Sequence, residues 1–190
     1  MSDTATTLDR QVNGLSVPTP GTYAIDVSHS TVQAVAKHML VSKVRVGFTD
    51  FQGTITVGEE PEDSAVQVAL KAASINSRDD NRDAHLRSGD FLDAETFPEI
   101  TFRSTDISPA WTISGDLTIR DTTRPVVLDT EYLGTLKSPM GPTVAVFSAS
   151  TSINREAFDI TWNAPMEAGG VLVGKDVRIE LEIQAVLQEG

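Results

Sequence analysis

The chain has 190 residues, of which 39% are hydrophobic and 22% are charged, a composition typical of one globular domain with a sizeable core. Its formal net charge of −12 disfavours binding to nucleic acid and to anionic membrane surfaces, because like charges repel. The absence of cysteine excludes disulfide frameworks, thiolate metal sites and cysteine nucleophiles.

The N-terminal sequence carries no feature of a secretory signal. Residues 1–20 lack a basic segment, an apolar segment and a small-residue cleavage site. No stretch of the chain approaches the roughly 20 apolar residues that a membrane span needs. We therefore expect a cytoplasmic protein with no stable membrane insertion. It would have a flexible lead-in over residues 1–20, closed by Pro18 and Pro20, and one domain over residues 21–190.

Apolar and polar residues alternate with a period of two from Gly21 onwards, a pattern typical of half-buried strands. Glycine and proline separate the alternating segments, as expected for turns. The sequence therefore predicts about eight antiparallel strands. In chain order, these cover residues 21–27, 31–37, 43–57, 64–71, 99–107, 111–120, 124–136, 143–153 and 177–187.

The alternation also predicts which side chains face inward. The clearest inward series, in the last strand, is Val177, Ile179, Leu181, Ile183, Ala185 and Leu187. Several inward positions of other strands are small, and small inward side chains leave space inside a barrel. We expect Ala34 and Ala36 to follow Val32 inward, and Ser148 and Ser150 to follow Val146.

One segment breaks the strand pattern. Residues 78–88 are expected to form a short helix, with Ser77 or Asp79 as its N-cap and Gly89 at its end. Asp83 and Arg87 are spaced as an i,i+4 ion pair. A long antiparallel sheet has two exposed edges, and closing the sheet into a barrel removes them. We therefore expect an all-β barrel with the helix at its mouth.

Several segments, in the same order, resemble the YceI-like family of polyisoprenoid-binding, lipocalin-like barrels. The resemblance covers about residues 21–188. It rests on "YAIDVSHSTVQAVAKHMLVSKVRVGFTDFQGTITV" (residues 23–57), "INSRDDNRDAHLRSGDFLDAETFPEITF" (75–102), "ISGDLTIRDTTRPVVLDT" (113–130), "INREAFDITWN" (153–163) and "VGKDVRIELEIQAVL" (173–187).

This resemblance implies an extended antiparallel barrel that holds a long apolar ligand, such as a polyisoprenoid or an isoprenoid quinone, and needs no other cofactor. Many family members are exported to the periplasm, and the lack of a recognisable signal peptide sets this chain apart from those. Family members are often dimeric, so a homodimer is also an expectation.

The polar cluster around His85 does not have the spacing of a metal or catalytic site. The chain's three histidines are His29, His38 and His85, and no two of them have a metal-ligand spacing. Side chains two positions apart on a helix, such as Asp83 and His85, point in different directions. No nucleophile elbow is present, and Ser88 has no orienting partner in the sequence. We therefore predict no metal site and no catalytic residues.

The helical phase gives this cluster two alternative roles. Arg78, Arg82 and His85 lie on one stripe of the expected helix, beside Leu86. In one alternative, their polar ends contact the head group of a ligand at the barrel mouth. In the other, Arg82 and Arg87 bind backbone carbonyls or carboxylates and only hold the helix in place.

We predict a ligand-binding site made of apolar cavity walls and a polar mouth. The expected ligand-binding residues are Phe48, Phe51, Arg82, His85, Leu86, Phe91, Phe97, Phe102, Trp111, Ile113, Leu117 and Phe147. The expected function is non-catalytic binding, storage or transport of an isoprenoid-type lipid. Two alternatives remain: an enzyme that acts on such a lipid through His85 with Asp83 or Asp90, and a stress-linked barrel with a solid interior.

Overall fold

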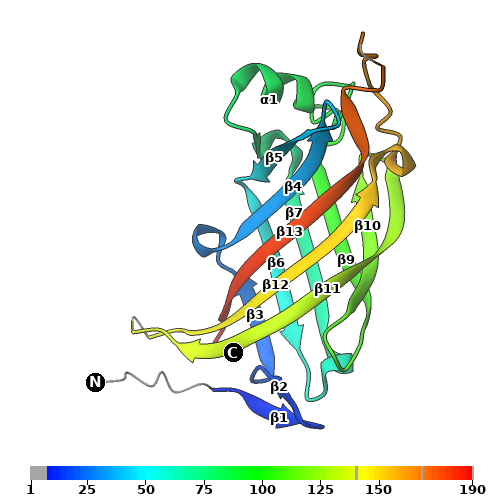
Figure 1. Cartoon of the computed structure of the whole chain (residues 1–190). Helices are drawn as coiled ribbons and strands as arrows, with labels where there is room; N and C mark the ends of the chain where they lie inside the picture. The colour runs from blue at the N-terminus through cyan, green and yellow to red at the C-terminus, as the bar shows by residue number, and fades with distance from the viewer. Residues whose placement is uncertain (1–7, 140, 168, 190) are drawn as a thin grey trace.

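The computed structural model describes residues 8–139, 141–167 and 169–189. Within these residues the chain forms one antiparallel barrel with one α-helix at an end (Figure 1). The barrel strands are β3 (Gly21–Ile25), β4 (Thr31–His38), β5 (Ser42–Phe48), β6 (Phe51–Val57), β7 (Ala65–Lys71), β8 (Ile75–Asn76), β9 (Glu99–Ile107), β10 (Ile113–Ile119), β11 (Thr122–Lys137), β12 (Thr143–Asn154) and β13 (Val173–Leu187).

The sheet closes on itself. Its strand order runs β12-β11-β10-β9-β7-β6-β3-β13, and β12 also pairs with β13. Strands β3 and β4 are consecutive parts of one barrel strand with a local interruption between them, and the same holds for β5 with β6 and for β7 with β8. Counted in this way, the described residues form an eight-stranded closed barrel. Closure satisfies the hydrogen-bonding groups of what would otherwise be two exposed edges. The predicted all-β barrel is therefore confirmed.

The predicted inward faces are confirmed on most strands. On β10, Ile113, Leu117 and Ile119 are buried while Asp116 is exposed. The prediction for β12 was wrong, because its inward residues are Phe147, Ala149, Thr151 and Ile153, and Ser148 and Ser150 lie on the outer face. The partner strand explains this difference. Phe147 and Ala149 pair with Ile183 and Leu181 of β13, and directly paired residues share one face of a sheet.

The expected helix is α1 (Asp80–Arg87), and it lies over one end of the barrel (Figure 1). Its N-cap is Asp79, whose side chain accepts a hydrogen bond from the backbone of Arg82. The helix ends with Ser88, rather than Gly89, as its C-cap.

The expected pair of Asp83 and Arg87 is not formed, because each side chain binds backbone groups before the helix. Asp83 is buried and accepts a hydrogen bond of 2.7 Å from the amide of Ser77. Arg87 donates to the carbonyls of Ala73 (2.7 Å) and Ile75 (2.8 Å). These bonds hold α1 against the end of β8.

Part of the expected flexible lead-in is folded. Residues 1–7 lie outside the described residues, but β1 (Arg10–Val12) and β2 (Leu15–Val17) form a two-stranded hairpin. Figure 1 shows this hairpin at the end of the barrel away from α1. Val17 is only 1% exposed, so burial of apolar surface against the barrel orders this segment.

Polar contacts tie the N-terminal segment to opposite sides of the barrel. The amide of Leu8 donates to the carbonyl of Thr135 on β11 (2.9 Å). Arg10 donates to the carbonyls of Gly58 (3.1 Å) and Glu59 (3.0 Å), just after β6. In the closed strand order, β11 and β6 are four strands apart in either direction, so residues 8–20 form a strap across this end.

Candidate functional site

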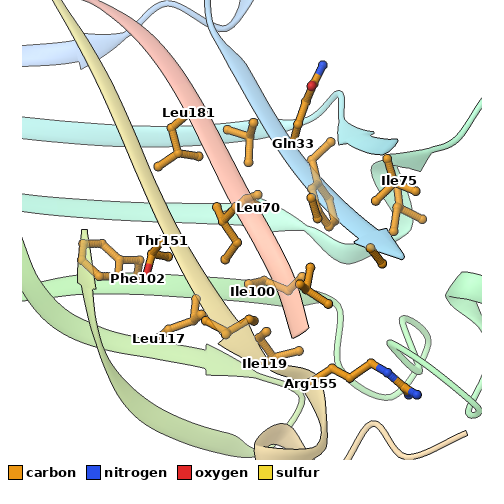
Figure 2. A pocket seen from close by; sticks show the side chains of 18 of the residues that line it. Gln33, Leu70, Ile75, Ile100, Phe102, Leu117, Ile119, Thr151, Arg155 and Leu181 are labelled. Atoms are coloured by element: carbon orange, nitrogen blue, oxygen red, sulfur yellow. The ribbon is translucent and has the colours of Figure 1, made fainter. Parts of the chain in front are cut away.

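The barrel encloses a cavity of about 400 Å³. Its walls come from nearly every barrel strand and from α1. Figure 2 shows the side chains of Leu70, Ile100, Leu117 and Leu181 extending from different strands into the same space. A cavity of this size, lined mainly by apolar side chains, is typical of small-molecule binding sites.

The structure brings most of the predicted site residues to this cavity. The lining includes ten of the twelve predicted residues, namely Phe48, Arg82, His85, Leu86, Phe91, Phe102, Trp111, Ile113, Leu117 and Phe147. The strand alternation predicted the position of Phe102, Trp111, Ile113 and Leu117, and the helical phase that of Arg82, His85 and Leu86. For Phe147 the predicted alternation was wrong, because it turned Val146 and Ser148 inward instead. Contact of the ten residues with a ligand remains a prediction.

Two predicted residues do not line the cavity. Phe51 is buried at the start of β6 and pairs with Leu70, but it belongs to the packed core. Phe97 lies in the loop before β9, where the guanidinium of Arg120 is 5.7 Å from its ring centroid. A cation beside an aromatic face is a stable surface arrangement, so Phe97 packs outside the cavity.

Small side chains on two strands leave the space that the cavity occupies. Ala34 and Ala36 on β4 line it, as predicted, and Ala149 and Thr151 on β12 line it in place of the predicted serines. Larger side chains at these positions would fill the volume. The cavity is therefore a consequence of residue size at a few inward positions.

An aromatic cluster surrounds His85 at the α1 end of the cavity. Its imidazole ring meets Phe91 and Trp162 edge-on, at centroid distances of 5.0 Å and 4.6 Å. Nε2 lies 2.8 Å from Oδ2 of Asp90, which fixes the orientation of the ring. Arg82 also lines the cavity here, with its guanidinium 3.9 Å from the carboxylate of Asp79. Arg82 and His85 therefore add polar, potentially cationic groups to the α1 end of a mainly apolar cavity.

Arg155 also lines the cavity, and the sequence did not identify it as a site residue. It lies in a 3-10 helical turn, Arg155–Phe158, directly after β12. Only 4% of the residue is exposed, and its guanidinium donates to the carbonyls of Gly174 (2.9 Å), Ile160 (2.8 Å) and Trp162 (2.9 Å). Burial lowers the pKa of Arg155. The local sequence contains no signal for this role, because Arg155 stands between the polar residues Asn154 and Glu156.

The described residues carry no group of three or more His, Cys, Asp or Glu side chains that could hold a metal ion. None of the described helices is both long and apolar enough to cross a bilayer. The polar groups at the cavity are few, and they lie mainly at its α1 end. This arrangement is suited to binding an elongated apolar molecule with a small polar end.

The fold and the cavity define a lipocalin-like β-barrel with an apolar interior cavity. A family model described as "YceI-like domain" matches residues 23–185. A UPF0312 protein of Staphylococcus aureus is 35% identical over 170 residues, which cover 88% of this chain and 98% of the relative. The chain therefore belongs to the YceI-like family.

Two solved structures have the same fold. The YCEI protein of Campylobacter jejuni matches with a TM-score of 0.68 and 28% identity, over 80% of this chain and 90% of that one. A polyisoprenoid-binding domain from Saccharophagus degradans matches with a TM-score of 0.63 and 11% identity, over 87% of this chain and 98% of that one. At 11% identity the second match concerns the fold alone.

Proposed function

We propose that this protein binds, stores or carries a long isoprenoid-type lipid, such as a polyprenyl diphosphate or an isoprenoid quinone, and does not react with it. The observation that carries this proposal is the enclosed apolar cavity with cationic groups at one end. The chain of the lipid would lie along the barrel, and its polar head would lie near Arg82 and His85.

The cavity could supply enough free energy for such binding. If about 600 Å² of ligand surface were buried, apolar transfer would contribute roughly 15 kcal/mol at ~25 cal/mol/Å². Ordering a flexible chain and losing its free translation would offset much of this. Few directional contacts are needed, so we expect tolerance towards chain length and head group. The S. degradans domain, which shares the fold, is described as polyisoprenoid-binding.

Native mass spectrometry of protein purified from its own host, followed by organic extraction and lipid identification, tests this proposal. We expect a co-purified isoprenoid lipid. Protein that is empty, and that binds neither an added long-chain quinone nor a prenyl diphosphate, would contradict the proposal.

A second candidate function is an enzyme acting on the same lipid, and the pairing of His85 with Asp90 favours it. A carboxylate that orients an imidazole is a usual part of general acid–base catalysis. Asp83, the other partner considered, is occupied by the amide of Ser77. If this function is correct, His85→Ala abolishes turnover and leaves lipid retention intact. A wild-type protein that leaves its bound lipid chemically unchanged supports the non-catalytic role.

The third alternative, a solid barrel, does not agree with the cavity. Homodimer formation stays a prediction, which light scattering of the purified protein would check.

A further inference from the structure

Exposed apolar side chains gather at the turn between β4 and β5, which we call the β4–β5 tip (Met39–Val41). Their exposed fractions are 47% for Met39, 58% for Leu40 and 89% for Val41. The amide of Met39 donates to the carbonyl of Leu172 (2.9 Å), and the neighbouring Val171 is also exposed. A contiguous exposed apolar patch on a globular domain usually marks an interaction site.

The backbone of the tip is unusual for these residues. Met39 and Leu40 have φ angles of +51° and +64°, the left-handed region that tight hairpin turns normally fill with asparagine and glycine. This conformation is uncommon for bulky side chains and costs free energy. Asparagine or glycine would form the turn more easily. The large apolar side chains are therefore better explained by contact with a binding partner than by the requirements of the turn.

The sequence segment that carries the tip has a charge opposite to that of the whole chain. From Val27 to Thr49 the sequence holds Lys37, Lys43 and Arg45 and no acidic residue, although the chain carries 27 acidic residues. Arg45 is paired with Glu180 (3.4 Å). Within the described part of the chain, neither Lys37 nor Lys43 forms an ion pair. The β4–β5 tip is therefore an apolar surface flanked by unpaired cations.

The tip lies at the rim of the cavity. Figure 1 shows the end of β4 at the same end of the barrel as α1. Lys37 and His38, which precede the tip, line the cavity, as do Val44, which follows it, and Leu172, which bonds to it. A surface that touches the tip would therefore lie next to this end of the cavity.

We propose that the β4–β5 tip docks the barrel on the surface of an anionic lipid bilayer. Leu40 and Val41 enter the interfacial region, and Lys43 faces the lipid phosphates. Apolar side chains with flanking lysines are the usual means of reversible binding to such surfaces. The net charge of −12 does not prevent this, because salt screens charges more than about 8–10 Å away. The mouth of the cavity then opens towards the membrane.

The purpose of this docking rests on the proposed lipid binding, but docking itself is measured separately. Flotation of the purified full-length chain would be compared on vesicles of phosphatidylcholine alone and of phosphatidylcholine mixed with phosphatidylglycerol. We expect flotation only with the anionic lipid, and less of it at high salt. Lys43→Glu should lower the partition constant by about fivefold, and the double variant Leu40→Ser, Val41→Ser by at least about tenfold.

Matched variants elsewhere on the barrel control for general changes in charge and hydrophobicity. Lys137→Glu makes the same charge change at the strap end. Leu133→Ser removes an apolar side chain that is 55% exposed on β11. Both should float like the wild type, and circular dichroism would verify that every variant is folded.

Three outcomes would overturn the proposal. These are a wild-type chain that does not float with anionic vesicles, tip variants that float as well as the controls, and tip variants that change only the oligomeric state. The last would assign the tip to contact with a second copy of the chain. Failure to bind any isoprenoid would refute the proposed function and leave the flotation result interpretable.

Discussion

The phenol hydroxyl of Tyr132 on β11 donates a hydrogen bond to the carboxylate of Asp9, 123 positions earlier in the chain. The same carboxylate accepts the amide of Thr135 at 2.8 Å. The ring of Tyr132 lies 5.3 Å from the ring of Phe147 and 6.2 Å from that of Trp111, and both of these line the cavity. The N-terminal strap therefore supports the part of the cavity wall formed by Trp111 and Phe147.

Loss of the Asp9 carboxylate should destabilise the barrel. Asp9→Ala leaves the Tyr132 hydroxyl and the Thr135 amide without their acceptor, and we expect the free energy of unfolding to fall by about 1–3 kcal/mol. Denaturant unfolding measures it. Asp116→Ala, which removes an exposed carboxylate on the outer face of β10, is the control and should change stability by less than about 0.5 kcal/mol. Equal effects would show that the strap contributes nothing specific.

Tyr23, which is buried, and Tyr132, which is partly buried, should make stability depend on alkaline pH. Burial raises the pKa of Tyr132, and its hydrogen bond to Asp9 raises it further; burial also raises the pKa of Tyr23. A raised pKa in the folded state means that the stabilising contribution is complete below the unfolded value of about 10 and is lost as pH rises above it. Unfolding free energy should therefore be constant below about pH 9 and fall progressively above about pH 10.

Tyr132→Phe is the matched test of this pH dependence. The variant is less stable at neutral pH but loses less stability on going to alkaline pH, because it has one fewer tyrosine with a raised pKa. Parallel pH profiles for the variant and the wild type would show that Tyr132 does not contribute.

A charge in the cavity wall should expel the ligand. Ile113→Glu places a carboxylate in the apolar cavity, where leaving it unpaired costs several kcal/mol. We expect native mass spectrometry to find the variant without lipid. Ser114→Glu, one residue along on the opposite face of β10, should retain it. Lipid retention by both variants would place the ligand elsewhere.

Arg82 and His85 should discriminate between head groups. With both replaced by alanine, affinity for a prenyl diphosphate should fall by about tenfold or more, because ionic hydrogen bonds to phosphate are lost. Affinity for a prenyl alcohol of the same length should change little. Titration of the two ligands gives the comparison, and an equal loss for both would indicate that these residues only hold the helix.

Arg155 should be essential for the end of the barrel near α1. Arg155→Met removes the side-chain donor from the buried carbonyl of Ile160 and from the partly buried carbonyls of Trp162 and Gly174. We expect the free energy of unfolding to fall by about 3 kcal/mol. Arg155→Lys should not restore it, since an ammonium group cannot reproduce the planar arrangement of donors. Arg178→Met, at an exposed arginine on β13, is the control for urea unfolding. A stable Arg155→Met variant would contradict this assignment.

The sequence was sufficient to predict which residues face inward wherever one face of a strand or helix is clearly more apolar than the other. The alternation in β13 and β10 predicted their inward residues, and the phase of α1 placed Arg82, His85 and Leu86 together at the cavity. The resemblance to the YceI-like family, which the family match bears out, also came from the order of local segments. These features depend on residues that are close in the sequence.

Tertiary structure decided the features that depend on distant partners. Both faces of β12 carry small and apolar residues, so pairing with Leu181 and Ile183 set which face points inward. The strap is ordered by burial of Val17 and by hydrogen bonds to the distant residues Tyr132 and Gly58. The carbonyls that accept from Arg155 likewise lie on segments that follow it by several residues or more. Local pattern fixes which face of a strand can be buried, but only the closed barrel determines which side chains, carbonyls and charges finally meet.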